Sequence, residues 1–272
     1  MNDADLAFMA RAAEAAARRG GAVVTEHFGL LSAGVVEKGP GDWVSEVDLA
    51  SEEAIRSVLE EEAPGVAFFG EEGGGERADL GWVVDPLDGT ANFLHGFAVV
   101  GVSVALVEGG RPVAGAVHAP LLGETYTAAR GQGAHRDGRR LAVADRAVGQ
   151  AICATGFPFK IKSRLDRYRQ VFDAAFLTFE DLRRPGAASL DLAWTAAGVF
   201  DGFFELGLGS WDVAAGALLV EEAGGTVTDW DGDGRAWLAS GDILAAPAAV
   251  HRTLLEIANR GDAGEGRSRM PV

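Results

Sequence analysis

The sequence is poor in cysteine, in positive charge and in long apolar stretches, and each scarcity excludes a class of protein. The single cysteine, Cys153, excludes an internal disulfide framework and a cysteine-based zinc site. The 24 lysine and arginine residues are outnumbered by 40 aspartate and glutamate residues, which gives a net charge of −16. No basic run is longer than a pair such as Arg139-Arg140 or Arg183-Arg184. We therefore expect no nucleic-acid partner.

Membrane and export signals are also missing from the sequence. The longest apolar run, residues 97–107, is far shorter than the roughly 20 residues that a membrane span needs. Residues 1–6 contain no basic segment that leads into an apolar one, which a secretory signal would require. We expect a cytoplasmic protein with no membrane partner.

The composition is that of a globular protein, with 48% hydrophobic and 24% charged residues among 272. Apolar periodicity and turn residues predict helices and strands in alternation. The expected helices are 4–19, which would end at Gly20-Gly21, then 48–62, 165–177, 189–197, 211–223 and 248–258. The expected strands are 66–69, 82–84, 101–107, 112–118, 125–129, 151–155, 203–205, 226–229 and 243–246. This mixture of hairpins and crossovers predicts a layered α/β (α+β) fold, and it argues against a pure Rossmann sheet.

The chain is long enough for two closely packed lobes. We place the boundary near residues 145–150, so that residues 1–150 form an N-terminal lobe and residues 151–260 a C-terminal lobe. Residues 261–272, rich in glycine, arginine and serine, are expected to be a flexible tail.

The most informative segment is residues 82–93, in which an apolar run leads into DPLDGTANF. The run predicts a buried strand that delivers Asp85 at its end. Pro86 favours an extended conformation before it, so we expect the chain to turn sharply there and bring Asp85 and Asp88 together. Gly89 leaves room for a close approach to the backbone. Thr90 is expected to begin a short helix, whose free N–H groups suit a phosphate.

Further carboxylates stand at the ends of other predicted elements. Glu71 and Glu72 follow a short apolar strand, and Asp212 lies in the first turn of an apolar helix. Taken singly, each group has a plain explanation as a turn, a solvated loop or a helix cap. Together in one cleft they would repel one another unless cations were bound. Oxygen ligands without cysteine or clustered histidine favour Mg²⁺, Mn²⁺ or Ca²⁺, so the sequence predicts a metal-assisted phosphoryl site.

Three of these segments, in this order, resemble the inositol monophosphatase family of Mg²⁺-dependent, lithium-sensitive sugar-phosphate phosphatases. They are residues 70–72 (GEE), 85–93 (DPLDGTANF) and 211–216 (WDVAAG), and the resemblance extends over about residues 5–258. It implies an alternating α-β-α-β-α sandwich of the inositol monophosphatase/fructose-1,6-bisphosphatase type, and a homodimer. Gly73 departs from the family, which usually has serine or threonine there, and we expect it to loosen the loop that carries Glu71 without removing a ligand.

The resemblance also implies a set of metal ligands, for about two to three Mg²⁺ ions per active site. The first ion would be held by Glu71, Asp85 and the backbone carbonyl of Leu87. The second would be held by Asp85, Asp88 and Asp212, and Glu71 would help to place a third.

Catalytic and substrate-binding roles follow from the same resemblance. Thr90 would orient the attacking water, with Asp48 as its acidic partner and Glu71 assisting. Phosphate would meet the N–H groups of Gly89 and Thr90. The substrate-binding set that the resemblance implies is Lys38, Glu71, Leu87, Asp88, Gly89, Thr90, Gly186, Ala187, Ala188, Glu205 and Asp212.

The implied activity is that of a phosphoric monoester hydrolase, an inositol-1-monophosphatase that releases myo-inositol and phosphate by metal-activated water. No covalent nucleophile stands out, because Cys153 lies on a predicted strand without a motif around it. Residues 91–93 with His95 resemble the inositol type and disfavour a nucleotide bisphosphate. Fructose-1,6-bisphosphatase or histidinol-phosphatase activity on the same scaffold remains an alternative. A non-catalytic module that binds a phosphorylated ligand or a protein is a more remote one.

Overall fold

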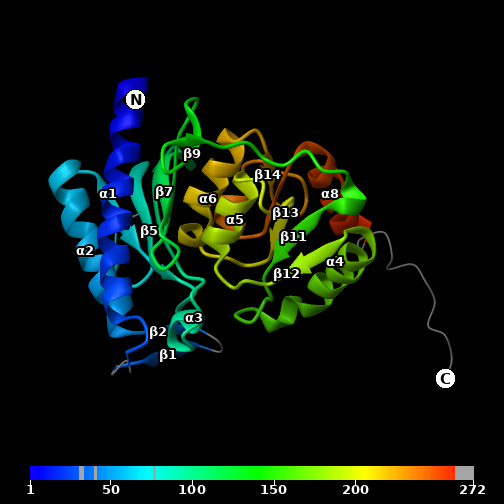
Figure 1. Cartoon of the computed structure of the whole chain (residues 1–272), viewed down its shortest axis with the longest axis horizontal. Helices are drawn as coiled ribbons and strands as arrows, with labels where there is room; N and C mark the ends of the chain where they lie inside the picture. The colour runs from blue at the N-terminus through cyan, green and yellow to red at the C-terminus, as the bar shows by residue number, and fades with distance from the viewer. Residues whose placement is uncertain (31–33, 40–41, 76–77, 261–272) are drawn as a thin grey trace.

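The computed structural model describes residues 1–30, 34–39, 42–75 and 78–260, and these form five layers in which helices and sheets alternate (Figure 1). The outer layer on one side contains α1 (Asp3–His27) and α2 (Glu46–Glu62), and the outer layer on the other contains α4 (Leu165–Thr178) and α8 (Ala248–Arg260). Between the two sheets lie α5 (Ala188–Ala196) and α6 (Ser210–Glu222). The expected α-β-α-β-α sandwich is confirmed. The expected flexible tail, 261–272, lies outside the described residues.

The larger sheet has eight strands in the order β10-β9-β8-β7-β6-β5-β3-β4. Only the β3–β5 pair is parallel; the other neighbours are antiparallel, including the predicted hairpin of β6 and β7. The strands are β3 (Ala67–Gly70), β4 (Gly74–Gly75), β5 (Leu80–Asp88), β6 (Gly101–Glu108), β7 (Arg111–Ala119), β8 (Glu124–Ala129), β9 (Gly133–Arg136) and β10 (Arg139–Arg140).

The smaller sheet has five strands in the order β12-β11-β13-β15-β14. Strand β11 is parallel to both of its neighbours, and β15 is antiparallel to both of its own. The strands are β11 (Ile152–Thr155), β12 (Asp181–Arg183), β13 (Gly202–Glu205), β14 (Thr226–Thr228) and β15 (Ile243–Ala246). The remaining elements are the hairpin β1 (Val36–Gly39) and β2 (Asp42–Val44), the short helices α3 (Thr90–Leu94) and α7 (Trp237–Ser240), and 3₁₀ turns at Val148–Gln150 and Lys162–Arg164.

The middle helix layer packs against both sheets. Helix α6 contacts β6 and β7 of the larger sheet and β14 and β15 of the smaller one. Its side chains from Val213 to Val220 are therefore apolar and buried around the whole helix rather than along one stripe. The division into lobes at residue 150 stays a prediction, because this layer is common to both sheets.

Helix α1 does not end at Gly20-Gly21 as we expected; it continues to His27. The two glycines do not end the helix; they allow neighbouring side chains to pack closely against it. A Cβ on Gly20 would lie 2.7 Å from Cδ1 of Ile55 on α2, and one on Gly21 would lie 2.4 Å from Cδ2 of His118 on β7. Tertiary packing therefore outweighs the low helix propensity of glycine at these positions.

The sharp turn expected at Pro86 is also wrong, because β5 continues to Asp88. Asp85 is paired with Ser103 of β6 and Asp88 with Gly101, so three steps along β5 match two along β6. This irregularity is a bulge, which bends the strand without ending it. Gly89 follows in the left-handed region (φ 90°), and Thr90 begins α3 as predicted.

Among the helices in the described part of the chain, none combines the length and the apolar character that crossing a membrane requires.

Candidate metal and phosphate site

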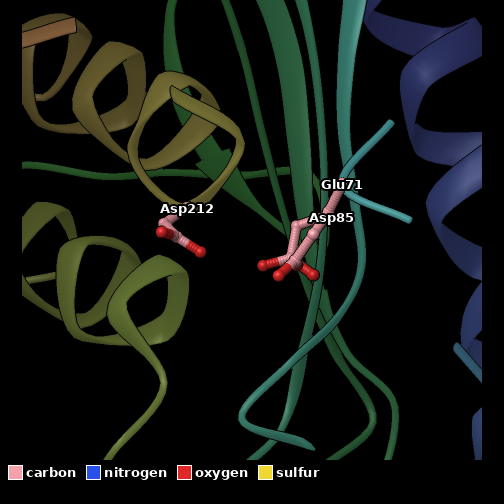
Figure 2. A group of neighbouring side chains, drawn as sticks. All are labelled: Glu71, Asp85 and Asp212. Atoms are coloured by element: carbon pink, nitrogen blue, oxygen red, sulfur yellow. The ribbon is translucent and has the colours of Figure 1, made fainter. Parts of the chain in front are cut away.

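Three carboxylates from distant parts of the chain converge at one point. Glu71 follows β3, Asp85 lies on β5, and Asp212 lies in the first turn of α6. One oxygen from each lies within 4.8 Å of those of the other two. Figure 2 shows the Asp212 carboxylate reaching from its helix toward the pair from the larger sheet. The predicted convergence of these three residues is therefore present in the structure.

Hydrogen bonds with backbone groups hold the three residues in place. The N–H of Glu71 donates to the carbonyl oxygen of Val84 (3.0 Å), which fixes the loop against β5. Asp85 accepts a hydrogen bond from the N–H of Leu87 (3.0 Å). Asp212 accepts one from the N–H of Gly209 (2.6 Å), as in a helix capping box.

The environment of these acids disfavours their ionised forms. Burial raises the pKa of Asp85 well above its ordinary range, and repulsion from Glu71, Asp88 and Asp212 raises it further. Burial, followed by repulsion from Glu71 and Asp88, raises the pKa of Asp212 to about 7. A divalent cation would remove this repulsion, and the donor set of carboxylate oxygens is the kind that Mg²⁺ binds. The residues present therefore fit the metal that the sequence predicts.

Asp88 lines the same cleft but is held from the other half of the chain. Its Oδ2 accepts hydrogen bonds from the backbone N–H (2.7 Å) and the hydroxyl (2.6 Å) of Ser189, at the start of α5. Burial raises the pKa of Asp88 to about 6, although the Ser189 bonds act in the opposite direction. Asp88 does not belong to the close group of three, which leaves its predicted role as a ligand of a second ion a prediction.

The predicted partnership of Thr90 and Asp48 corresponds to a direct contact. The Thr90 hydroxyl lies 2.9 Å from Oδ1 of Asp48 and 3.1 Å from the carbonyl oxygen of Leu87, and it can donate to either. Asp48 is buried, and its Oδ2 accepts from the N–H (2.9 Å) and the hydroxyl (2.5 Å) of Ser45. Burial raises the pKa of Asp48, while the bonds from Ser45 and Thr90 lower it.

A cleft of about 170 Å³ joins this cluster to most of the other predicted residues. Leu87, Gly89, Gly186, Ala188 and Glu205 all line it. Burial raises the pKa of Glu205 to about 8.

Two of the predicted residues lie behind or beside this lining. Ala187 lies behind Gly89, whose Cβ, if present, would be 3.4 Å from that of Ala187. Lys38 lies beside the cluster, with its Nζ 3.3 Å from Glu71 and 2.8 Å from Glu72.

Sequence reasoning missed several residues of the cleft wall. Lys160, Arg184, Phe157 and Phe159 line it, and the Arg184 guanidinium lies 5.5 Å and 5.7 Å from the centres of the two phenylalanine rings. Trp43 lines the cleft as well. These residues come from loops and a short strand, where no periodic pattern marks them. The one feature of the sequence that could have indicated them is the basic pair Arg183-Arg184. Because this pair is far in sequence from the acidic segments, nothing in the sequence showed that it lies beside them.

Comparison with known proteins gives a consistent picture. The profile described as "Inositol monophosphatase family" matches residues 5–262. The chain is 46% identical to "Nus factor SuhB" of Pseudomonas aeruginosa (81% of this chain, 84% of that one). It is 41% identical to "Inositol-1-monophosphatase" of Mesorhizobium japonicum (89% and 92%), and 38% to "Fructose-1,6-bisphosphatase/inositol-1-monophosphatase" of Aquifex aeolicus (91% and 94%). The crystal structure of the extragenic suppressor protein suhB from Bartonella henselae superposes with a TM-score of 0.88 at 36% identity (94% and 99%).

Proposed function

The chain belongs to the inositol monophosphatase family, and from this premise we propose that it is a Mg²⁺-dependent phosphatase that hydrolyses inositol monophosphate to myo-inositol and phosphate. One observation carries the proposal. The carboxylates of Glu71, Asp85 and Asp212 meet within 4.8 Å, and they open into the same cleft as Thr90. A cluster of acids costs free energy unless it binds cations, and such cations activate phosphate esters.

The proposed ligands of the first ion are Glu71, Asp85 and the carbonyl oxygen of Leu87. Asp85, Asp88 and Asp212 would hold the second, and Glu71 would help with a third. Bound Mg²⁺ would supply Lewis-acid chemistry, lowering the pKa of water and neutralising charge on the phosphate oxygens.

The chain itself would orient the nucleophile and the phosphate. When the Thr90 hydroxyl donates a hydrogen bond to Asp48, the lone pairs of Oγ1 are free to accept a hydrogen bond from the attacking water, which fixes the direction of attack. The backbone N–H groups of Gly89 and Thr90 would donate to the phosphate oxygens. Water would attack phosphorus as it loses a proton, the phosphorus–oxygen ester bond would break, and the leaving oxygen would take up a proton to form the alcohol, with no covalent enzyme intermediate.

The other wall of the cleft suits a small phosphorylated polyol. Glu205 lines this wall, and its carboxyl oxygens can accept a hydrogen bond from a sugar hydroxyl. Gly186 and Ala188 leave room beside it. Lys160 and Arg184 add positive charge that attracts an anionic substrate into an otherwise acidic protein. A cytoplasmic homodimer is the proposed setting.

Two alternatives have observations in their favour. The relative from Aquifex aeolicus carries a name with both activities, which keeps fructose 1,6-bisphosphate as an alternative substrate, together with histidinol phosphate. The name "Nus factor SuhB" on other relatives favours a second, non-catalytic role in a protein assembly. Such a role would not need the carboxylate cluster.

The test is phosphate release from inositol 1-phosphate, fructose 1,6-bisphosphate, histidinol phosphate and adenosine 3′,5′-bisphosphate, with Mg²⁺, without it, and with Li⁺ added. The variant Asp88→Asn removes one proposed ligand, and Asp79→Asn is a matched control because Asp79 is exposed beside the same strand. We expect Mg²⁺-dependent, Li⁺-inhibited release, with inositol 1-phosphate the best substrate. Asp88→Asn should abolish the release, while Asp79→Asn should leave it unchanged. Equal turnover by wild type and Asp88→Asn would rule out the assignment.

A further inference from the structure

Glu52 lies on α2, outside the cleft lining, and reaches the loop that carries Glu71. Only 4% of its surface is exposed. Its Oε2 accepts a hydrogen bond from the N–H of Glu72 (2.9 Å), and its Oε1 accepts one from the N–H of Gly73 (3.0 Å). One carboxylate thus binds two successive backbone donors of the loop. Charge-assisted bonds of this kind are among the stronger ones in proteins.

These bonds continue a row that begins at Glu71 itself. The N–H of Glu71 donates to Val84 of β5, and the next two N–H groups donate to Glu52. Three consecutive backbone donors are therefore engaged, one by the strand that carries Asp85 and two by α2. The Cα of Glu71 is fixed from both sides, which directs its side chain toward Asp85 and Asp212 (Figure 2).

The sequence leaves room for this carboxylate. A Cβ on Gly70 would lie 2.2 Å from Oε2 of Glu52, and a Cβ on Gly73 would lie 2.4 Å from Oε1. Either side chain would push the carboxylate away from the loop. Gly73, which we expected to loosen the loop, instead donates to Glu52 and lets it approach.

A cation on the same helix holds Glu52 in this orientation. Arg56, one turn further along α2, places its Nη2 3.2 Å from Oε1 of Glu52. Its guanidinium lies 3.8 Å from the ring centre of Phe68 on β3. Arg56 thus contacts the same oxygen that accepts from the Gly73 N–H, and its positive charge makes the burial of the Glu52 carboxylate tolerable.

From this geometry we propose that Glu52 is a positioning residue for Glu71, which sets the affinity of the carboxylate cluster for divalent cations through the loop backbone. The inference rests on the proposed function, because it takes Glu71 to be a metal ligand. Groups that orient metal ligands typically change affinity by about 10- to 100-fold when they are replaced. Glu52 does not touch the cleft, so its replacement should weaken cation binding more than it slows the chemistry.

The test is Mg²⁺ binding by isothermal titration calorimetry without substrate, followed by phosphate release over a range of Mg²⁺ concentrations. Glu52→Gln keeps the shape of the side chain but turns one acceptor into a donor facing a backbone N–H. Glu52→Asp retains the charge on a shorter side chain. Glu53→Gln is the matched control, because Glu53 is the adjacent, exposed residue of α2. Circular dichroism and thermal melting check that each variant is folded.

We expect Glu52→Gln and Glu52→Asp to weaken Mg²⁺ binding by about 10-fold or more, with Glu53→Gln unchanged. The rate of phosphate release at saturating Mg²⁺ should recover to within a few-fold of wild type. Unchanged Mg²⁺ affinity in folded Glu52→Gln and Glu52→Asp would overturn the inference, even if the wild type is an active phosphatase. Weakened binding in a protein that hydrolyses none of the substrates would support Glu52 as a positioning residue and reject the proposed function. A wild type that binds no Mg²⁺ would overturn both.

Discussion

At the scale of single residues, the cluster is an arrangement of charges that the fold holds together against their repulsion. Asp85 and Asp212 each accept a hydrogen bond from a backbone N–H two or three residues away, which limits the conformations of the carboxylates before any ion binds. Their raised pKa values reflect burial and mutual repulsion. Such preorganisation makes cation binding more favourable, because the bound ion relieves repulsion that is already present.

Thr90 provides a prediction at this scale. Replacing it with valine keeps the shape but removes the hydroxyl that contacts Asp48. We expect phosphate release at saturating Mg²⁺ to fall by about 100-fold or more, the range found when a group that positions a proton is lost. Thr90→Ser, which keeps the hydroxyl, should retain most of the activity. Equal rates for Thr90→Val and Thr90→Ser would show that the hydroxyl has no part in orienting water.

Sequence patterns identified the acids of the cluster but not all of the residues that hold them in place. The acids at 71, 85, 88 and 212 stand in motifs, and the structure brings three of them within 4.8 Å. Ser189 and Glu52 contact the site through partners 101 and 20 residues away in sequence, respectively. A serine at a helix start and a glutamate within a helix are common for other reasons, so no local signal marks them as parts of a site.

At the scale of elements, the site depends on where strands and helices end or bend. Asp85 and Asp88 lie on one continuous strand, β5, on either side of a bulge. The position of this bulge depends on how β5 pairs with β6. Pro86 favours an extended backbone before it, and that preference is compatible with either a turn or a bulged strand. The sequence therefore predicted the acids near the end of a strand correctly but not the path between them, because strand pairing is a long-range property.

Helix α1 gives a prediction at this scale. Alanine is usually better than glycine inside a helix by about 1 kcal/mol. At Gly21 we expect the opposite, because a Cβ would lie 2.4 Å from His118. Gly21→Ala should lower the free energy of unfolding by about 1–3 kcal/mol, the usual cost of overpacking. Urea unfolding measures this difference, and an increase in stability would show that the close contact between α1 and β7 is not maintained.

At the scale of the whole molecule, the cleft lies where three layers meet. The larger sheet supplies Asp85 and Asp88, the loop after its strand β3 supplies Glu71, the middle helix layer supplies Asp212, and the smaller sheet supplies Glu205. The order of helices and strands was largely predicted from hydrophobic periodicity. The short strands β1, β2, β4, β9, β10 and β12 were not, because strands of two to four residues carry too little pattern.

The packing of α1 on the larger sheet also predicts a pH dependence of stability. Burial lowers the pKa of His118 below its ordinary value of 6.5, although its carboxylate neighbours act in the opposite direction. The unfolded chain therefore binds protons more readily than the fold does, and this residue makes the protein less stable as pH falls through about 6.5. The buried acids of the site, whose pKa values are raised, act in the opposite direction, so single variants must be compared with wild type.

The comparison uses His118→Gln, which cannot titrate, and His95→Gln as a control at an exposed histidine. Unfolding free energies are measured in urea between about pH 5 and 8. We expect the unfolding free energy of wild type minus that of His118→Gln to increase as pH rises through about 6.5, by more than the corresponding difference for His95→Gln. If both variants follow the wild-type slope, the buried imidazole does not contribute to acid destabilisation.

The central claim is that Glu71, Asp85 and Asp212 together form a binding site for divalent cations. Its most direct test is anomalous diffraction from crystals grown with Mn²⁺, which prefers the same oxygen ligands as Mg²⁺ and gives its own signal. The account predicts a strong anomalous peak bonded to oxygens of all three carboxylates. An empty cluster at saturating Mn²⁺, with the three side chains pointing apart, would contradict it.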